Sequence, residues 1–329
     1  MKILLNANGS STIGLGHVFR CLTIANEIKT IVPKSELFFI GNIESTLKEN
    51  LLNDFTCLDP SINKEQIIKL IKNADIFISD ILNTPNDHIS RIRTLNPLLK
   101  IICIDNNTHL KKINEADIVF NANLFNRINF INGDTKYYLG PKYMILRPDF
   151  RNKPPINFKN KTIFICFGGA DDKGYTLNAI KAIKNLEINM DINIIVGPLF
   201  RHIDELNQLI NNPNFHIFIN PTNIIELMLK TSLAIVSAGI ILYEVSALGI
   251  PSIVIPQVDH QSDIAEEFSK NRACINLGQN AEVRIISKNL TKLLSEEKLR
   301  KNISSNAKNF VDGKGLDRFI KIILEDSNV

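Results

Sequence analysis

The stretch SLAIVSAGIILYEVSALGIPSIVIP, Ser232 to Pro256, decides the fold. It is long and apolar enough for a membrane span, but Glu244 and Pro251 fall inside it, and Gly239 and Gly249 divide it. The divided pattern predicts a buried strand, a glycine corner, a short helix, a turn and a second buried strand. Two strands joined through a helix are typical of a parallel sheet. The apolar residues of this stretch are then buried between the layers of the protein, so we expect no stable insertion into a membrane.

Outward from this stretch, short apolar runs alternate with amphipathic helical segments over most of the chain. Many runs are apolar at consecutive positions, a pattern typical of strands that are covered on both faces. The predicted strands are Lys2–Asn6, Leu37–Ile40, Asp75–Ser79, Ile101–Ile104, Ile118–Asn121, Thr162–Phe167, Ile192–Val196, His216–Ile219, Leu233–Ser237, Ser252–Ile255 and Ala273–Leu277. Because the alternation occurs twice, it indicates two doubly wound α/β domains with parallel sheets.

The alternation is interrupted at LRPDFRNKPPINFKNK, Leu146 to Lys161, where prolines disrupt regular structure. A strand, a glycine turn and a helix then follow in TIFICFGGADDKGYT, as they do in KILLNANGSSTIGLGHVFR near the start of the chain. We therefore expect an N-terminal domain over residues 1–150 and a second domain over 151–312. A helix within 313–329 is expected to cross back to the first domain.

Composition narrows the class of protein. The 329 residues favour two domains, and a net charge of +4 with both signs mixed offers no basic arm for nucleic acid. The five cysteines are too widely spaced for a metal site and favour a reducing compartment. The opening MKILLNANGS turns polar too early for a signal peptide. We expect a cytoplasmic monomer that binds no nucleic acid and requires no metal or other cofactor.

Residues that carry chemistry are expected where parallel strands end, because helices there present free N–H groups. The first such corner contains Gly14, Gly16 and His17. Glycines let a phosphate or sugar approach the backbone, and a histidine at a helix start lies at the positive end of the helix dipole. The dipole favours the neutral imidazole that a general base requires. Asp80 and Asp105 also follow strands and are candidates for substrate contacts.

The second domain has three such corners. The pair Gly168–Gly169 follows its first strand and precedes Asp171. Glu244 lies on the apolar helix of the opening stretch, where a carboxylate is costly unless it is paired or binds ligand hydroxyls such as those of a ribose. His260 and Gln261 stand at a later helix start and can reach sugar hydroxyls or phosphate.

Each of these residues also has a purely structural interpretation. Asp171, His260 and Gln261 are equally well placed for helix caps, and the two strand-end aspartates for caps or turns. His17 is also explained as a solvated histidine near a helix cap, and Glu244 as a surface glutamate. The neighbours of Glu244 are apolar on nearly every face of its helix, which weakens the surface interpretation.

Several common motifs are missing from the sequence. Phe19 stands where a third glycine would complete a dinucleotide-binding GxGxxG, and no acidic residue ends the next strand. There is no Asp-x-Asp, no Walker lysine loop and no G-x-S-x-G elbow. The sequence therefore disfavours NAD binding and a metal-bridged diphosphate site.

Four stretches together resemble the PseG-type UDP-sugar hydrolases, which belong to the wider GT-B group that includes the MurG glycosyltransferases. They are GLGHVFR (14–20), YYLGPKYMILRPDF (137–150), IFICFGGADDKGYT (163–176) and LYEVSALGIPSIVI (242–255). The closing VDGKGLDRFIKII (311–323) also resembles the crossing helix of that family. The resemblance implies a GT-B fold, two Rossmann-like domains whose parallel sheets face each other across a cleft, with UDP on the second domain and the sugar on the first.

The activity that the resemblance implies is hydrolysis of UDP-2,4-diacetamido-2,4,6-trideoxy-β-L-altropyranose, a step toward pseudaminic acid in bacterial surface glycans. By the same resemblance, His17 positions or activates the attacking water. Glu244 of the Tyr243–Glu244 motif binds the uridine ribose, and the corner glycines hold the diphosphate. Arg20 of the first motif, Tyr243 and Gly239 complete the set of candidate substrate-binding residues.

The sequence departs from the family pattern at three places. Ala238-Gly239-Ile240 replaces paired glycines, DNNTH (105–109) replaces an Asp-Asp pair, and DILNT (80–84) lacks a tyrosine. Two alternatives to a hydrolase therefore stay open. One is a GT-B glycosyltransferase that uses a UDP-sugar donor, and the other is a nucleotide-sugar-binding protein without catalysis.

Overall fold

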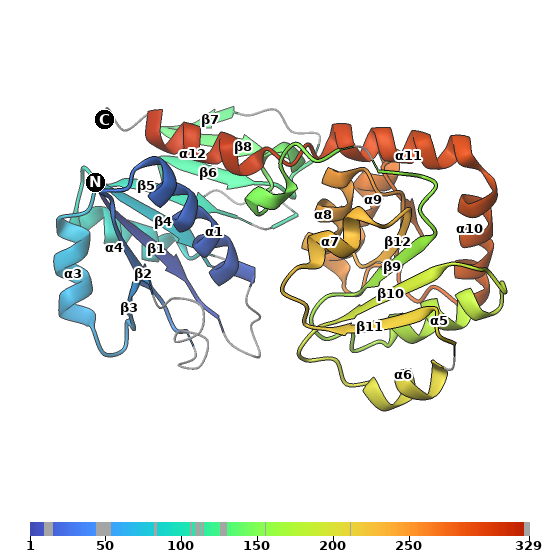
Figure 1. Ribbon diagram of the computed structural model, residues 1–329. Coiled ribbons are helices and arrows are strands. Elements are labelled where there is room, and N and C mark those ends of the chain that lie inside the picture. The colour runs from blue at the N-terminus through green and yellow to red at the C-terminus, as the bar shows by residue number, and fades with distance from the viewer. Residues whose placement is uncertain are drawn as a thin grey trace. The chain divides into compact units, whose positions relative to one another are not determined.

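The computed structural model describes residues 1–9, 16–43, 54–81, 84–105, 107–108, 113, 115–125, 130–154, 156–210 and 212–325. The chain forms two compact units: unit 1 is Met1–Pro148 with Lys314–Val329, and unit 2 is Asp149–Gly313. Each unit contains one largely parallel sheet with helices packed on it (Figure 1). The predicted class, two doubly wound α/β domains, is confirmed.

The sheet of unit 1 has the strand order β3-β2-β1-β4-β5-β6-β8-β7, in which β7 pairs antiparallel with β8. Its strands are β1 (Lys2–Ala7), β2 (Glu36–Ile40), β3 (Thr56–Leu58), β4 (Ile76–Asp80), β5 (Lys100–Ile104), β6 (Ile118–Asn121), β7 (Phe130–Asn132) and β8 (Thr135–Leu139). Its helices are α1 (Gly16–Ile31), α3 (Lys64–Lys72), α4 (Asn86–Leu95) and α12 (Gly315–Glu325), and a 3₁₀ turn lies at Pro141–Tyr143. The strands β3, β7 and β8 are not among those that the sequence predicts.

Successive residues of each central strand of unit 1 enter two different cores. On β4, Ile76 and Ile78 pack with α1 and α12, whereas Phe77 packs with α3 and α4. Both faces are therefore covered, which explains the apolar residues at consecutive positions. The helix α12 buries Leu316 and Phe319 in the first of these cores, and a fully buried side chain of this size contributes about 1.5–3 kcal/mol.

The sheet of unit 2 has the strand order β11-β10-β9-β12-β13-β14, and its paired strands are parallel. Its strands are β9 (Thr162–Cys166), β10 (Asp191–Val196), β11 (Phe215–Ile219), β12 (Leu233–Val236), β13 (Ser252–Val254) and β14 (Ile275–Asn276). Its helices are α5 (Tyr175–Lys184), α6 (Ile203–Leu209), α7 (Ile224–Leu229), α8 (Ile240–Leu248), α9 (Asp259–Lys270), α10 (Val283–Ser295) and α11 (Glu297–Phe310), and a 3₁₀ turn lies at Pro148–Phe150.

The stretch from Ser232 to Pro256 forms β12, α8 and β13, as its pattern predicts. Gly249 ends α8 at φ +74°, in the left-handed region that favours glycine, and the chain then returns into β13, parallel to β12. Within the described ranges, the structure has no helix of the length and apolarity that a membrane span requires.

The first six strands of each unit follow the order 3-2-1-4-5-6 of doubly wound sheets. In such sheets the order reverses between the first and fourth strands, and ligands bind outside the carboxyl ends of the strands at that point. The reversal lies between β1 and β4 in unit 1 and between β9 and β12 in unit 2. A functional site is therefore expected at the carboxyl ends of β1 and β4 in unit 1 and of β9 and β12 in unit 2.

Candidate functional site

Three candidate residues of unit 1 meet where its strand order reverses. His17 and Arg20 lie on α1, which follows β1, and Asp80 is the last residue of β4. The two strands are neighbours, with Ala7 opposite Asp80, so their carboxyl ends share one edge of the sheet. His17 and Asp80 are 63 positions apart in the sequence, yet the fold brings their side chains into contact.

The three side chains form a compact hydrogen-bonded cluster. His17 Nδ1 lies 2.7 Å from Asp80 Oδ1. Arg20 donates from Nε to Asp80 Oδ2 at 2.6 Å and from Nη2 to Asp80 Oδ1 at 2.5 Å, a bidentate guanidinium–carboxylate pair. The Asp80 side chain is fully buried, whereas that of His17 is 16% exposed and that of Arg20 is 9% exposed. Of the three, His17 is the side chain that offers the most surface to a ligand.

The charges of the cluster determine which nitrogen of His17 carries the hydrogen. Burial alone would raise the pKa of Asp80, but the charge of Arg20 and the hydrogen bonds from His17 and Arg20 outweigh it and lower that pKa. Asp80 is thus a carboxylate, which accepts hydrogen bonds and cannot donate them. A hydrogen shared with this carboxylate therefore belongs to His17 Nδ1, and in the neutral form of the ring Nε2 is then the proton acceptor.

Asp80 and Arg20, both candidates for substrate contacts, are hydrogen-bonded to each other within this cluster. Both oxygens of Asp80 accept hydrogen bonds from within the protein, and Arg20 directs Nε and Nη2 at Asp80. Of the corner glycines, Gly16 begins α1 and is exposed, and Gly14 lies outside the described residues.

Asp105, which follows β5, is held in a local network. Its Oδ1 accepts a hydrogen bond from Asn107 Nδ2 at 2.6 Å, and its Oδ2 accepts one from Asn121 Nδ2 at 2.9 Å. Asn121 Nδ2 also donates to the backbone oxygen of Asn107. These contacts tie the end of β6 to the segment that follows β5, which is the turn-stabilising interpretation of Asp105.

In unit 2, candidate residues from neighbouring strands meet at the carboxyl edge. Gly168 and Gly169 follow β9, and Gly239 precedes α8 after the adjacent β12. Gly168 has φ +81°, and a Cβ built on either Gly168 or Gly169 meets no atom within 4 Å, so the space beside this backbone is open. A Cβ built on Gly239 lies 3.9 Å from Gln261 Nε2. The structure therefore brings Gln261 to the corner before α8.

Two further residues at this edge are absent from the candidates that the sequence supplied. Gln257 Nε2 donates to the backbone oxygen of Phe167 at 2.5 Å, and its backbone N–H donates to Gln261 Oε1 at 3.0 Å. Gly197, after β10, packs so closely on Gly169 that an added Cβ would lie 2.4 Å from the Cα of that residue. Gly197 and Gln257 each follow a predicted strand closely. The expectation that functional residues lie where parallel strands end therefore applies to these two residues as well.

Asp171 and Tyr243 have structural roles in unit 2. The carboxylate of Asp171 accepts the backbone N–H groups of Tyr175 at 2.9 Å and Thr176 at 2.8 Å, which caps the first turn of α5. Tyr243 is 1% exposed, and its ring packs edge-on against Phe268 with centroids 5.0 Å apart. The capping interpretation of Asp171 is therefore the one that the geometry supports, and Tyr243 packs in the core.

Glu244 lies on α8, and its charge reaches the carboxyl end of β9. Burial foremost, and then the charges of Glu244 and Asp171, raise the pKa of the Cys166 thiol to about 12, partly offset by a hydrogen bond from the backbone of Gly168. The charge of Glu244 therefore acts on the thiol at the last residue of β9. His260 is exposed in the first turn of α9.

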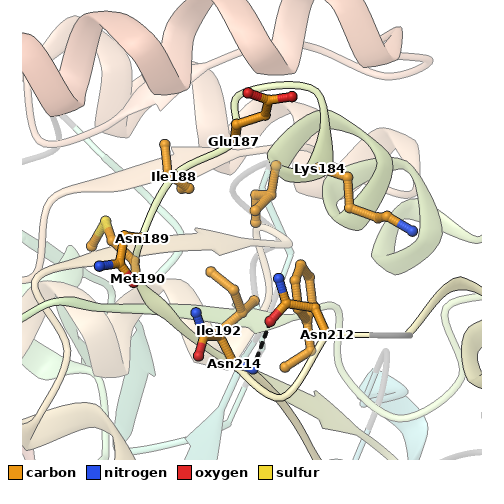
Figure 2. Close-up of a pocket in the computed structure, with 10 residues that line it drawn as sticks. Lys184, Glu187, Ile188, Asn189, Met190, Ile192, Asn212 and Asn214 are labelled. Atoms are coloured by element: carbon orange, nitrogen blue, oxygen red, sulfur yellow. Dashed lines mark hydrogen bonds between the residues drawn. The ribbon is translucent and has the colours of Figure 1, made fainter.

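A pocket of about 380 Å³ in unit 2 lies at the amino ends of β10 and β11, opposite the carboxyl ends where the candidate residues gather. Figure 2 shows its lining, which comes from the end of α5 and the starts of β10 and β11, with Ile188, Met190 and Ile192 providing apolar surface. The backbone N–H of Asn214 donates to Asn212 Oδ1 at 2.9 Å beside it. Because doubly wound sheets bind ligands at the carboxyl ends of strands, this pocket is not assigned to the candidate site.

Known proteins resemble this chain in sequence, and solved structures resemble it in fold. Residues 147–310, which make up nearly all of unit 2, match the family described as Glycosyl transferases group 1. An uncharacterised protein of Methanocaldococcus jannaschii is 35% identical over 291 residues, which are 82% of this chain and 58% of that protein. The chain thus spans less than two thirds of the length of this relative.

Two further relatives have descriptive names. The spore coat polysaccharide biosynthesis protein SpsG of Bacillus subtilis is 27% identical over 99% of this chain and 98% of its own length. The UDP-2,4-diacetamido-2,4,6-trideoxy-β-L-altropyranose hydrolase of Campylobacter jejuni is 25% identical over 82% of this chain and 97% of its own length. Among solved structures, MurG of Acinetobacter baumannii has a TM-score of 0.68 and 16% identity over 98% of this chain and 99% of that one, a likeness of fold.

Proposed function

Because this chain belongs to the PseG-like group of the GT-B superfamily, we propose that it is a UDP-sugar hydrolase that cleaves the anomeric C–O bond of a UDP-linked diacetamido-trideoxy sugar. The products are UDP and a free sugar for the synthesis of a nonulosonic, pseudaminic-type acid in the cytoplasm. The observation that carries the proposal is the 2.7 Å contact between His17 Nδ1 and Asp80 Oδ1. It leaves Nε2 of a partly exposed imidazole as a base at the carboxyl edge of unit 1.

In the proposed reaction, His17 Nε2 takes a proton from a water molecule while the water oxygen attacks the anomeric carbon. The bond from that carbon to the β-phosphate oxygen breaks, and the oxygen leaves with the electron pair as part of UDP. The Asp80 carboxylate supports this step, because it stabilises the positive ring that forms as the proton arrives. General-base assistance of this kind contributes about 10²–10⁴ in rate.

We assign the nucleotide to unit 2. Backbone N–H groups of the Gly168–Gly169 corner and of the start of α8 provide donors for the diphosphate and for the charge that develops on the leaving oxygen. Glu244, which lies on α8 and whose charge acts on Cys166 at the end of β9, is proposed to accept hydrogen bonds from the ribose hydroxyls. Gln257 supports the backbone around this site, because its Nε2 donates to the backbone oxygen of Phe167 and its backbone N–H donates to Gln261 Oε1.

Gly197→Ala is expected to weaken UDP binding by about tenfold, which corresponds to about 1.4 kcal/mol. The new methyl group would overlap Gly169 Cα and O, at 2.4 and 2.5 Å, and displace the glycine corner. Isothermal titration with UDP measures the change. Gly133→Ala is the control: its methyl group meets no atom within 4 Å, its strain at φ +62° arises in a turn of unit 1, and it is expected to leave UDP affinity unchanged. Wild-type affinity in the Gly197 variant would separate this corner from the nucleotide.

The proposed activity is tested by incubating the protein with a panel of UDP-diacetamido sugars in ¹⁸O-labelled water and analysing the products by mass spectrometry. Label in the free sugar with unlabelled UDP is expected, because water attacks carbon. Label in the phosphate would place the attack at phosphorus and contradict the mechanism. UDP binding without turnover on every sugar of the panel would instead favour a binding protein without catalysis.

A second candidate function is glycosyl transfer from a UDP-sugar. It is favoured by the match of residues 147–310 to Glycosyl transferases group 1 and by the fold shared with MurG. The same base would then remove a proton from a sugar or lipid hydroxyl in place of water. UDP release without any acceptor, at a rate that candidate acceptors do not increase, supports the hydrolase. Release that depends on an added acceptor supports the transferase.

A further inference from the structure

Arg20 is the least explained member of the cluster in unit 1. It stands three positions after His17 on α1, so the two side chains lie on the same side of the helix. The sequence suggests a substrate contact for it, but its side chain is 9% exposed and two of its nitrogens are directed at Asp80. A residue used in this way acts on the substrate through another residue.

The bidentate pair determines how Asp80 meets His17. Arg20 Nε donates to Asp80 Oδ2. Arg20 Nη2 donates to Asp80 Oδ1, the same oxygen that contacts His17 Nδ1. Two parallel hydrogen bonds fix the plane of a carboxylate as well as its position. Oδ1 is therefore held at 2.7 Å from His17 Nδ1, and the imidazole ring has a fixed partner on that side.

The charge of Arg20 determines which hydrogen-bond role Asp80 can take. Asp80 is fully buried, and burial by itself favours the protonated, neutral carboxyl group. A protonated Asp80 would donate to His17 Nδ1 and move the ring hydrogen to Nε2, where it would block the proposed base. The adjacent guanidinium favours the carboxylate, which can only accept. The thiol of Cys21, which also lies beside this pair, is kept neutral by burial, which raises its pKa well above the ordinary value.

We propose that Arg20 is a positioning residue, which holds Asp80 as an ionised, oriented acceptor so that His17 carries its hydrogen on Nδ1 and presents Nε2 as the base. This inference rests on the proposed role of His17 in hydrolysis. It removes Arg20 from the substrate contacts and gives it an effect on kcat in place of an effect on substrate binding.

The first test reads the tautomer of His17 directly in the free protein. Nitrogen-15 NMR of histidine-labelled protein distinguishes protonated from unprotonated ring nitrogens, and the His17→Ala spectrum assigns the signal among the six histidines. We expect the Nδ1–H form in the wild type, most of it retained in Arg20→Lys, and a shift toward Nε2–H in Arg20→Met. If Arg20→Met does not fold, Arg20→Gln, which keeps a donor without the charge, takes its place.

The second test separates positioning from substrate contact by kinetics. Arg20→Met is expected to lower kcat by about 10- to 100-fold, by analogy with the residues that orient metal-ligating histidines, with KM nearly unchanged. Arg20→Lys keeps the charge and is expected to recover most of that loss. Arg93→Lys is the matched control, because Arg93 also pairs with an aspartate of unit 1, Asp117, at 2.8 Å, without contact to His17. Arg93→Lys is expected to change neither kcat nor the tautomer of His17.

Two results would overturn the inference. One is a raised KM with wild-type kcat in the Arg20 variants, which would make Arg20 a substrate contact. The other is an unchanged His17 tautomer in the charge-removing variant. The NMR measurement requires no substrate, so a tautomer shift in a protein that hydrolyses no UDP-sugar would contradict the proposed function and leave the positioning role intact.

Discussion

Replacement of His17 by alanine is expected to lower kcat for UDP-sugar hydrolysis by about 10²- to 10⁴-fold while the affinity for UDP stays nearly unchanged. The variant loses the nitrogen that accepts the proton from water, and no other candidate base of the described part of unit 1 is paired with Asp80 in its place. UDP affinity is assigned to unit 2, so it does not depend on the imidazole. Single-turnover rates measure the first effect and isothermal titration measures the second.

The chain supplies a matched control for this variant. His216 Nε2 lies 3.2 Å from Asp191 Oδ1, so it also forms a histidine–aspartate pair, but its side chain is 44% exposed and the aspartate is the first residue of β10. This pair is at the amino end of the strands of unit 2. His216→Ala is expected to retain wild-type kcat. Equal activity in the His17 and His216 variants would remove the imidazole of His17 from the mechanism.

The fold was predictable from the sequence because its dominant pattern is local. A strand covered on both faces shows apolar residues at consecutive positions, and a turn such as Gly249 shows itself by residue type. The strand β8 (Thr135–Leu139) lacks such a run because its pattern alternates: Thr135, Tyr137 and Leu139 are buried, Lys136 is exposed and Tyr138 is half-buried. It lies toward the edge of the sheet, where Tyr137 and Leu139 enter one core and Tyr138 is only partly covered on the other face.

The site was predictable in part. A rule about strand ends finds His17, Asp80 and the glycine corners, because it requires only the position of each residue in its own segment. It cannot determine that His17 and Asp80 share a hydrogen bond, since that depends on β1 and β4 being neighbours in the sheet. Tyr243 shows a second limit: α8 is apolar on nearly all sides, so periodicity does not reveal which of its faces is buried.

Asp80→Ala is expected to destabilise unit 1 by about 3–5 kcal/mol at neutral pH, because it removes the carboxylate that pairs with the buried guanidinium of Arg20. The two units need not unfold together, so the free energy of unfolding is best followed by hydrogen exchange in peptides of α1 and β4 under increasing urea. Asp87→Ala removes the same charge from a pair with Arg91 in which the side chains are 67% and 80% exposed. It is expected to cost about 0–1 kcal/mol.

The pH dependence of that destabilisation identifies its cause. The pKa of Asp80 in the folded protein lies below its ordinary value of 3.8, so the unfolded chain takes up the proton first as the pH falls. The stability contributed by the ionised carboxylate is therefore fully present above the ordinary pKa and is lost as the pH falls from about 3.8 through the folded pKa. The difference in unfolding free energy between wild type and Asp80→Ala is expected to be largest at neutral pH and to narrow in that acidic window, where the wild type also loses the counter-charge of Arg20. A difference that stays constant down to the acid end would assign the loss to packing and contradict the ion pair as the source of stability.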